Sequence, residues 1–419
     1  MHDFHDVGNE LYCERVAVAK IAKTVGTPFY LYSRRTLTSH FQAVDGAFAA
    51  IPHVTAFAVK ANSNLAIMRL FASLGGGADI VSGGELFRAL KAGVPREKIV
   101  FAGVGKTREE IAEALHARIL LFNVESDQEL RVIDEVARSL KRRARISLRV
   151  NPHIDPRTHP YISTGLKQSK FGIDIDRALE QYKVATTLSG VDVVGVHHHI
   201  GSQLTQVQPF VEAMARVLEL VDALTSHGIV IRYLDMGGGL GIPYKDEVPP
   251  SPREMAEAVL PLLRGRAMTL ILEPGRVLVG NAGILVTKVL YTKQGPEKNF
   301  VVVDAGMSDL IRPSLYEAYH HIRPVRRTTR RPRVVDVVGP ICESGDFLAQ
   351  DRELPACEPG ELLAVMSAGA YGFAMASHYN SRPFVAEVMV DGSRYHVVRE
   401  RESYRDLVRG ETIPPSLRR

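Results

Sequence analysis

The sequence predicts an α/β protein built on a closed (β/α)8 barrel of the TIM type, and two observations support that prediction. From about residue 54 to 276, short apolar runs rich in β-branched residues alternate with segments of helical periodicity, which is the pattern of parallel βα units. The runs number eight, which favours a closed barrel over an open sheet. The predicted strands cover residues 54–61, 78–82, 99–103, 119–124, 146–151, 191–200, 231–236 and 269–273.

The segments between these runs have the spacing of amphipathic helices. They cover residues 84–92, 108–117, 127–140, 175–188, 209–227 and 252–264. Helix N-caps favour small polar residues, because their side chains accept hydrogen bonds from the first free backbone amides. Ser82, followed by Glu85, fits a capping box, and Ser126 and Ser251 are further expected N-caps.

The sequence pattern changes after residue 276. From there on, runs typical of strands follow one another with few helical segments between them. These runs cover residues 282–291, 299–304, 333–338, 361–367 and 384–390. Residues 1–29 contain no complete βα unit. We therefore expect a barrel domain over residues 30–276 and a mainly β domain formed by residues 1–29 together with 277–419.

Composition excludes several classes of protein. The 419 residues are 45% hydrophobic and 24% charged, which is typical of a folded globular chain and not of a disordered one. The formal charge of +5 owes much to the arginine-rich run 326–333, which we interpret as a solvated loop and not as a nucleic-acid site, because it lacks interleaved aromatic residues.

Cysteine usage and hydropathy indicate the compartment. Three scattered cysteines are too few for a disulfide framework or a cysteine zinc site, so a reducing environment is expected. The N-terminus lacks a basic segment followed by an apolar stretch, and no run approaches 18 apolar residues. We expect a cytoplasmic protein with no membrane partner.

Polar residues at the carboxyl ends of the predicted strands are candidates for function, because barrels place their chemistry there. Lys60 stands out, since a desolvated lysine with a lowered pKa forms Schiff bases with carbonyls or with pyridoxal phosphate. A strand-end lysine can also extend to solvent and have no chemical task. The other strand-end polar residues are Asn62, Asp79, Ser82, Arg149, Asn151, His197, His199, Asp235, Glu273 and Arg276.

Two loops after the last predicted strands could bind an anion. Residues 237–241 offer glycine amides to a phosphate, although a tight turn explains them equally well. Arg276, three residues after Glu273, suits bidentate anion contacts. In a strand only His197 and His199 of the histidine triplet would share a face, and two ligands do not make a typical metal site, so we expect no metal.

Together, a Schiff-base lysine, an anion-binding mouth and an acidic residue describe a pyridoxal phosphate site, in which Glu273 keeps the pyridine nitrogen protonated. The motif Ala58-Val59-Lys60-Ala61-Asn62, the glycine loop and Glu273-Pro274-Gly275-Arg276 resemble the alanine-racemase-like, fold III pyridoxal phosphate decarboxylases. Further motifs of this family lie in the expected order at residues 159–165, 169–172, 199–203, 339–346 and 369–372. The resemblance extends from about residue 5 to 410.

The resemblance implies a role for particular residues. Lys60 would carry the cofactor, His199 would stack on its ring, and Cys342 would be the general acid. The cofactor-binding set would be Lys60, Asp79, His199, Ser202, Gly238, Gly239, Glu273, Gly275, Arg276 and Tyr371. The substrate-binding set would be Arg276, Arg312, Tyr316, Glu343 and Tyr371. The family acts as a homodimer in which Cys342 and Glu343 reach into the partner's site.

Arg312 and Glu343 together suit an amino-acid substrate that carries a carboxylate and an ammonium group at its far end. Decarboxylases of the same fold that act on ornithine, arginine or carboxynorspermidine remain alternatives, but their substrates would leave Arg312 without a counter-charge. A non-catalytic protein that stores pyridoxal phosphate is another alternative, and it would not need Cys342. The chain departs from the family at His198, where cysteine or a small residue is common, and at His378, where asparagine is common; the sequence assigns His378 no role.

Overall fold

The computed structural model describes residues 2–155 and 170–417, and the chain divides into two compact units. One unit is Leu37–Gly280, and the other combines Met1–Thr36 with Asn281–Arg419.

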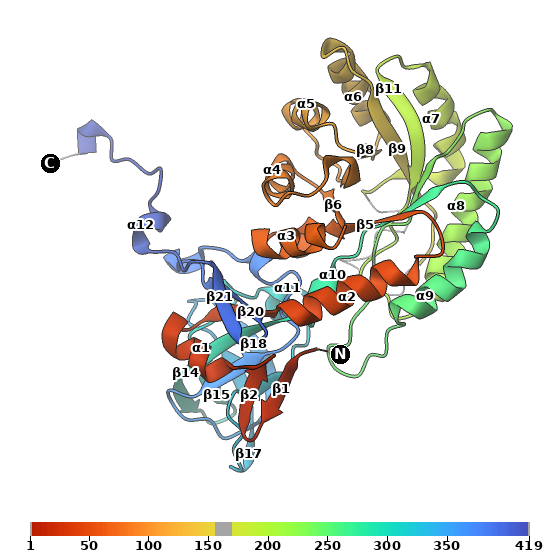
Figure 1. Ribbon diagram of the computed structural model, residues 1–419. Coiled ribbons are helices and arrows are strands. Elements are labelled where there is room, and N and C mark those ends of the chain that lie inside the picture. Colours follow the sequence, from red (N-terminus) through yellow and green to blue (C-terminus); the bar gives the residue numbers. More distant parts are fainter. Residues whose placement is uncertain (1, 156–169, 418–419) are drawn as a thin grey trace. The chain divides into compact units, whose positions relative to one another are not determined.

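The unit Leu37–Gly280 contains a closed barrel of eight parallel strands, as predicted (Figure 1). Around the barrel the order is β9, β11, β12, β13, β5, β6, β7 and β8, and β8 pairs with β9 to close it. The strands are β5 (His53–Ala58), β6 (Gly77–Ile80), β7 (Ile99–Phe101), β8 (Leu121–Val124), β9 (Ala144–Asn151), β11 (Val191–His197), β12 (Tyr233–Asp235) and β13 (Thr269–Leu272). A short strand, β10 (Ile173–Asp174), extends the sheet beside β9.

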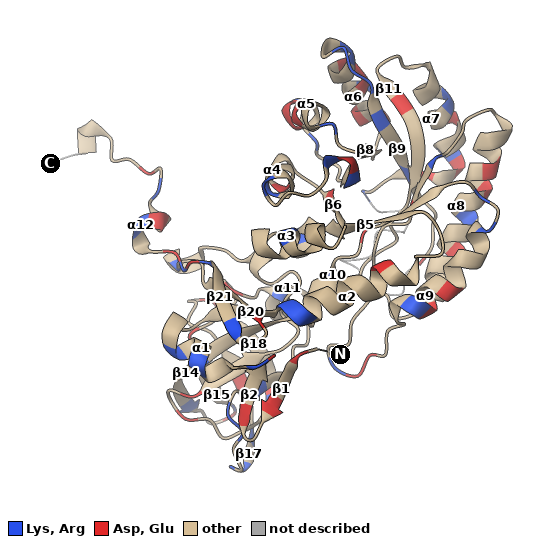
Figure 2. Ribbon diagram, viewed as in Figure 1, with Lys and Arg blue, Asp and Glu red and all other residues tan. Residues whose placement is uncertain are grey.

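Helices surround the barrel and begin with the cap chemistry that the sequence predicts. The side chains of Ser82, Ser126 and Ser251 each accept a hydrogen bond from the backbone amide three residues later. The helices are α3 (Leu65–Ser73), α4 (Gly83–Lys91), α5 (Arg108–Ala117), α6 (Asp127–Ser139), α7 (Ile175–Thr187), α8 (Gln208–Ser226), α9 (Pro252–Val259) and α10 (Arg276–Val279). Charges of both signs are mixed along α6 to α9 (Figure 2), as on solvated helix faces.

The barrel is held together by apolar side chains from strands that are distant in the sequence. Val100, Leu121 and Ile271 are each at most 1% exposed and belong to one cluster. Burial of each such side chain stabilises the fold by about 1.5 to 3 kcal/mol. The packed interior therefore gives the polar loops at the carboxyl ends of the strands a rigid support.

The second unit is mainly β and includes the N-terminal segment, as predicted. Its large sheet runs β18, β17, β15, β14, β4, β20 and β21, with β19 pairing both β14 and β16. These strands are β4 (Phe29–Ser33), β14 (Gly283–Gln294), β15 (Asn299–Val303), β16 (Ile322–Pro324), β17 (Pro332–Val338), β18 (Phe347–Pro355), β19 (Leu362–Val365), β20 (Ala386–Asp391) and β21 (Arg394–Arg399). A small sheet of β1 (Phe4–Val7), β2 (Glu10–Cys13) and β3 (Val16–Ala17) also belongs to this unit.

Two predicted strands end earlier than the sequence suggests. β5 stops at Ala58, and Lys60 lies in the short 3-10 turn Val59–Ala61 that follows. β11 stops at His197, so the expectation that His197 and His199 share one strand face is wrong. In both places the polar residues lie in loops, where a backbone can turn toward the barrel mouth.

The arginine-rich run is mostly exposed to solvent, as expected, but it is only partly a loop. Part of it is strand β17, and Arg326, Arg327 and Arg330 form ion pairs with acidic residues of the same unit. Their partners are Glu10, Asp6, Glu358 and Glu361. None of the helices in the described part of the chain is both long and apolar enough to cross a membrane.

Candidate active site

Lys60 and Asp79 come together at the mouth of the barrel, at the ends of two neighbouring strands. The Lys60 Nζ donates a hydrogen bond to Asp79 Oδ2 at 2.5 Å, and the Asp79 side chain is fully buried. The Lys60 side chain remains 36% exposed, so its amine is open to a ligand. Within the described residues, the other oxygen of Asp79 has no hydrogen-bond partner.

The charge around Asp79 explains why this pair is chemically unusual. The pKa of Asp79 is raised to about 7, because burial and then the nearby Glu273 carboxylate raise it more than the Lys60 ammonium lowers it. A buried carboxyl group with one unsatisfied oxygen is costly. The arrangement therefore provides an unused hydrogen-bonding position beside the amine.

The loops after β11, β12 and β13 approach each other so closely that only glycine fits between them. A Cβ at Gly238 would lie 2.1 Å from the Glu273 carbonyl oxygen, and one at Gly239 would lie 2.4 Å from the Gly201 carbonyl oxygen. Gly239 also has a φ of +121°, a conformation that L side chains rarely adopt. The close approach exceeds what a simple tight turn needs, and it brings the backbones of the three loops into direct contact.

His199 lies against this glycine loop. Its Nδ1 accepts a hydrogen bond from the Gly238 amide at 3.2 Å, so the proton of a neutral ring is on Nε2. Burial, followed by the positive charges of Arg149 and Lys60, lowers the pKa of His199 well below its ordinary value. The ring is therefore neutral and fixed in orientation, as a ring that stacks on a ligand should be.

Arg276 forms the second part of the anion site, at the start of α10. Its Nε and Nη2 donate to the Ser202 hydroxyl at 3.3 and 2.9 Å, and its Nη1 donates to the Tyr244 hydroxyl at 2.6 Å. Arg276 is only 6% exposed. A buried guanidinium can bind an anion through two parallel hydrogen bonds, so Arg276 suits a phosphate at this position.

Glu273 belongs to a buried network beneath this mouth. The Asn123 amide donates to Asp235 at 2.9 Å and to Glu273 at 3.3 Å, and Asn123 in turn accepts from the Ser147 hydroxyl. Burial and the neighbouring Glu273 carboxylate raise the pKa of Asp235 well above its ordinary value. The network thus fixes the orientation of Glu273.

A second buried network supports the loops after β7, β8 and β9. Arg149 Nη1 donates to Glu125 at 2.8 Å, and Glu125 also accepts the Gly172 amide at 2.9 Å. Lys106 donates to Glu129 at 2.7 Å beside this pair. The predicted motif at 159–165 and Ser169 lie outside the described residues.

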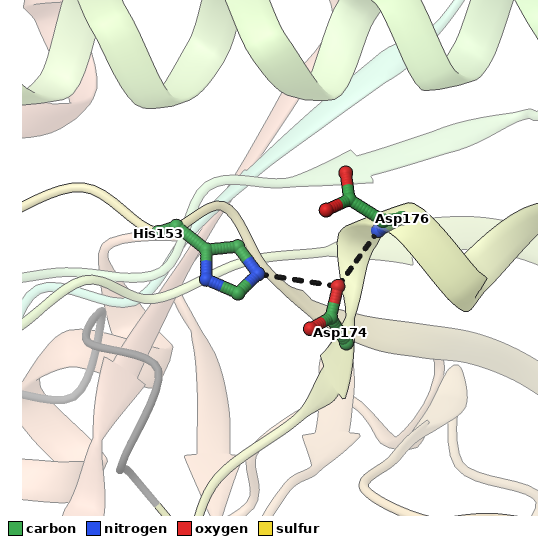
Figure 3. Close-up of side chains that lie close together, drawn as sticks. All are labelled: His153, Asp174 and Asp176. Atoms are coloured by element: carbon green, nitrogen blue, oxygen red, sulfur yellow. Dashed lines mark hydrogen bonds and ion pairs between the residues drawn. The ribbon is translucent and has the colours of Figure 1, made fainter.

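Among the residues that the structure describes, two groups of side chains have the composition of metal ligands. His197, Asp235 and Glu273 form one, but both carboxylates already accept the amide hydrogen bonds described above. The other is His153, Asp174 and Asp176 (Figure 3), where His153 pairs with Asp174 at 3.2 Å. Asp174 is the N-cap of α7 and accepts the Asp176 amide, which gives this group a structural explanation.

The remaining predicted residues lie in the mainly β unit. Arg312, on α11 (Arg312–Tyr316), is 6% exposed and donates from Nη1 to His320 Nε2 at 2.9 Å. Because arginine can only donate, His320 is neutral, and its Nδ1 donates to the Met366 carbonyl at 2.9 Å. Tyr371 follows β19 with a φ of 54°, a left-handed backbone conformation.

Cys342 and Glu343 lie on an exposed loop that is held at its base by Asp346. The Asp346 carboxylate accepts the amides of Met307 and Ile341, each at 2.6 Å. The Ser314 hydroxyl on α11 donates to the Gly345 carbonyl at 2.5 Å, so the loop is tied to the helix that carries Arg312 and Tyr316.

The predicted residues are therefore divided between the two units. The barrel unit holds Lys60, Asp79, His199, Ser202, Gly238, Gly239, Glu273, Gly275 and Arg276. The β unit holds Arg312, Tyr316, Cys342, Glu343 and Tyr371. Sequence reasoning missed Tyr244 and Asn123; a polar residue inside the apolar run Leu121–Val124 was the available signal for Asn123.

The barrel mouth fits pyridoxal phosphate on three observations: the amine of Lys60, the cradle of glycine backbones, and the guanidinium of Arg276 facing neutral hydroxyls. Comparison with known proteins agrees. Residues 34–280 match the family model "Pyridoxal-dependent decarboxylase, pyridoxal binding domain". The fold and the site thus define a pyridoxal-dependent decarboxylase of fold III.

Comparison with sequence relatives and solved structures identifies the family within this class of decarboxylases. The diaminopimelate decarboxylase of Aquifex aeolicus is 52% identical over 400 residues, which are 95% of each chain, and that of Pseudomonas aeruginosa is 52% identical over 97% of this chain and 98% of the relative. Among solved structures, the diaminopimelate decarboxylase of Helicobacter pylori in complex with L-lysine superimposes with a TM-score of 0.90 at 46% identity, over 93% of this chain and 98% of that one. The M. jannaschii enzyme with L-lysine gives 0.94 at 42% identity, over 99% and 98%. The chain belongs to the diaminopimelate decarboxylase family.

Proposed function

We propose that this protein removes CO2 from meso-2,6-diaminopimelate to give L-lysine, the last step of lysine biosynthesis. The observation that carries the proposal is the pairing of Lys60 with a buried Asp79 at the mouth of the barrel, in a chain about 50% identical to diaminopimelate decarboxylases over nearly its whole length. Two solved relatives of that name bind L-lysine, the product of the proposed reaction.

The barrel residues would hold the cofactor. Lys60 would bind its carbonyl carbon, Arg276 and Ser202 with the glycine amides would bind its phosphate, and Glu273 would face its pyridine nitrogen. Bound pyridoxal phosphate supplies an electron sink that stabilises the carbanion left when CO2 departs. His199, neutral and fixed by Gly238, would orient the ring.

Residues of the β unit would bind the distal groups of the substrate and deliver the proton that completes the reaction. Arg312 would bind the distal carboxylate, Glu343 would bind the distal ammonium group, and Tyr316 and Tyr371 would close around them. Cys342 would deliver a proton to the substrate carbon after CO2 leaves. The hydrogen bond between Ser314 of α11 and the Cys342 loop helps to hold the proposed proton donor in a fixed position on its own chain.

The proposed assembly is a homodimer in which Cys342 and Glu343 act in the partner's barrel. Their exposure on a loop of the single chain agrees with such a role. We further propose a cytoplasmic location, since the three cysteines are free thiols.

A CO2-release panel tests the proposed function. The purified protein, supplied with pyridoxal phosphate, is incubated separately with meso-diaminopimelate, ornithine, arginine and lysine. We expect release from diaminopimelate at least about a hundredfold faster than from the others, because a buried Arg312 without its carboxylate partner is unfavourable. Faster release from ornithine or arginine would indicate a different decarboxylase of this fold, and no release from any amino acid would indicate a storage protein.

A further inference from the structure

His378, to which the sequence assigns no role, begins a short segment whose backbone is strained. Asn380 and Ser381, which lie two and three residues after His378, have φ values of 55° and 53°. Two successive non-glycine residues in the left-handed region each cost of order 1 kcal/mol or more. Such a conformation persists only where neighbouring contacts hold it.

Three side chains hold one end of this segment. The His378 ring stacks on Phe384, with ring centroids 4.0 Å apart and planes at 27°. His378 Nε2 lies 2.6 Å from a carboxylate oxygen of Glu402. The same oxygen accepts the Phe384 amide at 3.0 Å, and the Glu402 amide donates to the Phe384 carbonyl at 3.0 Å. We call His378, Phe384 and Glu402 the histidine clamp.

The other end of the segment contacts the proposed proton donor loop. The side-chain oxygen of Asn380 accepts the backbone amide of Cys342 at 2.8 Å. The Tyr379 hydroxyl donates to the Glu343 carboxylate at 3.1 Å. Tyr379 and Asn380, the two residues that directly follow His378, therefore each contact one of the residues to which we assign chemistry.

We propose that His378 is a positioning residue: through the histidine clamp it holds Tyr379 and Asn380 in the conformation that fixes Cys342 and Glu343. The catalytic meaning of this role rests on the proposed function, but the mechanical coupling does not. The clamp requires both an aromatic face for Phe384 and a donor that reaches Glu402, and imidazole supplies both. Asparagine, the common family residue here, has a shorter side chain and no ring.

Amide hydrogen exchange of the holoenzyme tests the coupling without any turnover. The probe is the Cys342 amide, measured in peptides that contain residues 339–346. We expect His378→Ala to speed its exchange about 5- to 10-fold, the factor that corresponds to losing about 1 kcal/mol of net hydrogen bonding. Asn380→Ala removes the acceptor itself and defines the largest effect. His396→Ala, at an exposed histidine of β21, is the matched control and should leave the exchange unchanged.

Two more variants separate the clamp from a general loss of stability. Glu402→Gln removes the ion pair while leaving the His378 ring in place, so exchange at Cys342 should rise by a smaller factor than in His378→Ala. His378→Asn should behave like His378→Ala if the ring matters. Wild-type exchange at Cys342 in both His378→Ala and Glu402→Gln, with faster exchange in Asn380→Ala, would overturn the proposal.

Steady-state kinetics with meso-diaminopimelate give the second readout. His378→Ala should lower kcat several-fold through Cys342 and raise KM through Glu343, and the same split should appear in Asn380→Ala. A change in kcat with unchanged exchange at Cys342 would also contradict the positioning role. If wild-type protein releases no CO2 while the exchange pattern appears as expected, the proposed function fails and the mechanical coupling stands.

Discussion

The Lys60 amine donates a hydrogen bond to an Asp79 carboxylate that is fully buried and has one unsatisfied oxygen among the described residues. The buried acid keeps the amine at the barrel mouth, and the amine in turn compensates part of the acid's charge. Each of the two is therefore unfavourable without the other, and both should respond when the other is changed.

Lys60→Ala should abolish CO2 release and the visible absorbance of bound pyridoxal phosphate, because the amine is the only proposed covalent anchor. The far-UV circular dichroism should stay like that of the wild type, since the barrel core lies in other residues. Lys183→Ala, at an exposed helix lysine, is the control and should keep both signals. Retained absorbance in Lys60→Ala would show that another lysine carries the cofactor.

The contribution of Asp79 to the stability of the apo-protein should fall as the pH rises from about 4 to about 7. The folded-state pKa of Asp79 is raised to about 7, mainly by burial, so the native state binds a proton that the unfolded chain has already lost. The stabilising contribution is complete below about pH 4 and is lost as the pH passes through about 7. Glu85, whose pKa burial also raises to about 7, titrates in the same window.

Asp79→Asn isolates the Asp79 contribution. Because asparagine does not ionise, the thermal midpoint of the variant relative to that of the wild type should rise as the pH increases from 4 to 7. Thermal unfolding of apo-protein at several pH values measures this, with Asp222→Asn on the surface as the control. Equal slopes in wild type and Asp79→Asn would mean that Asp79 does not carry the raised pKa.

Gly238→Ala should weaken pyridoxal phosphate binding about tenfold to hundredfold, because its Cβ would push the loop after β12 away from the Glu273 carbonyl. Spectroscopic titration of apo-protein with the cofactor gives the Kd. Gly105→Ala is the matched control, since a Cβ there meets nothing within 4 Å. Wild-type affinity in Gly238→Ala would argue that the glycine cradle does not bind the phosphate.

Cys342→Ala should keep the cofactor absorbance and lower kcat by about 10² to 10⁴, the usual contribution of a general acid. Cys357→Ala is the internal control: burial raises the pKa of that thiol to about 11, and it lies outside the proposed site. An unchanged kcat in Cys342→Ala would remove this residue from the proton-donor role.

The shared-site dimer predicts complementation. When Lys60→Ala and Cys342→Ala chains are mixed, unfolded and refolded together, random pairing should restore about a quarter of wild-type activity, because half the dimers contain one intact site. Activity that stays at the level of the separate variants would place Cys342 in the site of its own chain, or show that chains do not pair.

The barrel could be predicted from the sequence because its strands are short apolar runs that alternate with capped helices. Helix α2 (Arg34–Ala47) was missed because it precedes the first predicted strand and its apolar residues are few. Strand β18 was missed because its centre, Gln350 to Glu353, is polar. It is a strand because it pairs with β17, and not because of a hydrophobic pattern in its sequence.

Site residues at the carboxyl ends of the barrel strands could be predicted from the pattern of the sequence, whereas site residues in other positions could not. Lys60 and Asp79 are 19 residues apart, yet both were identified because parallel neighbouring strands end at the same mouth. Tyr244 contacts Arg276 across 32 residues from within a loop, and no periodic pattern indicates such a contact. The histidine clamp likewise depends on tertiary packing between residues 378, 384 and 402.

Strand β4 has a consequence for the order in which the chain folds during synthesis. Its two partners in the sheet are β14 and β20, and β20 ends at Asp391. At about 5 to 20 residues per second, the ribosome needs roughly 20 to 70 s to make the chain from β4 to β20. The barrel can be completed within that interval, whereas Phe29–Ser33 can pair with β14 on one side and must wait for β20 on the other. Nascent chains stalled before residue 386 should therefore be the ones that depend on chaperones.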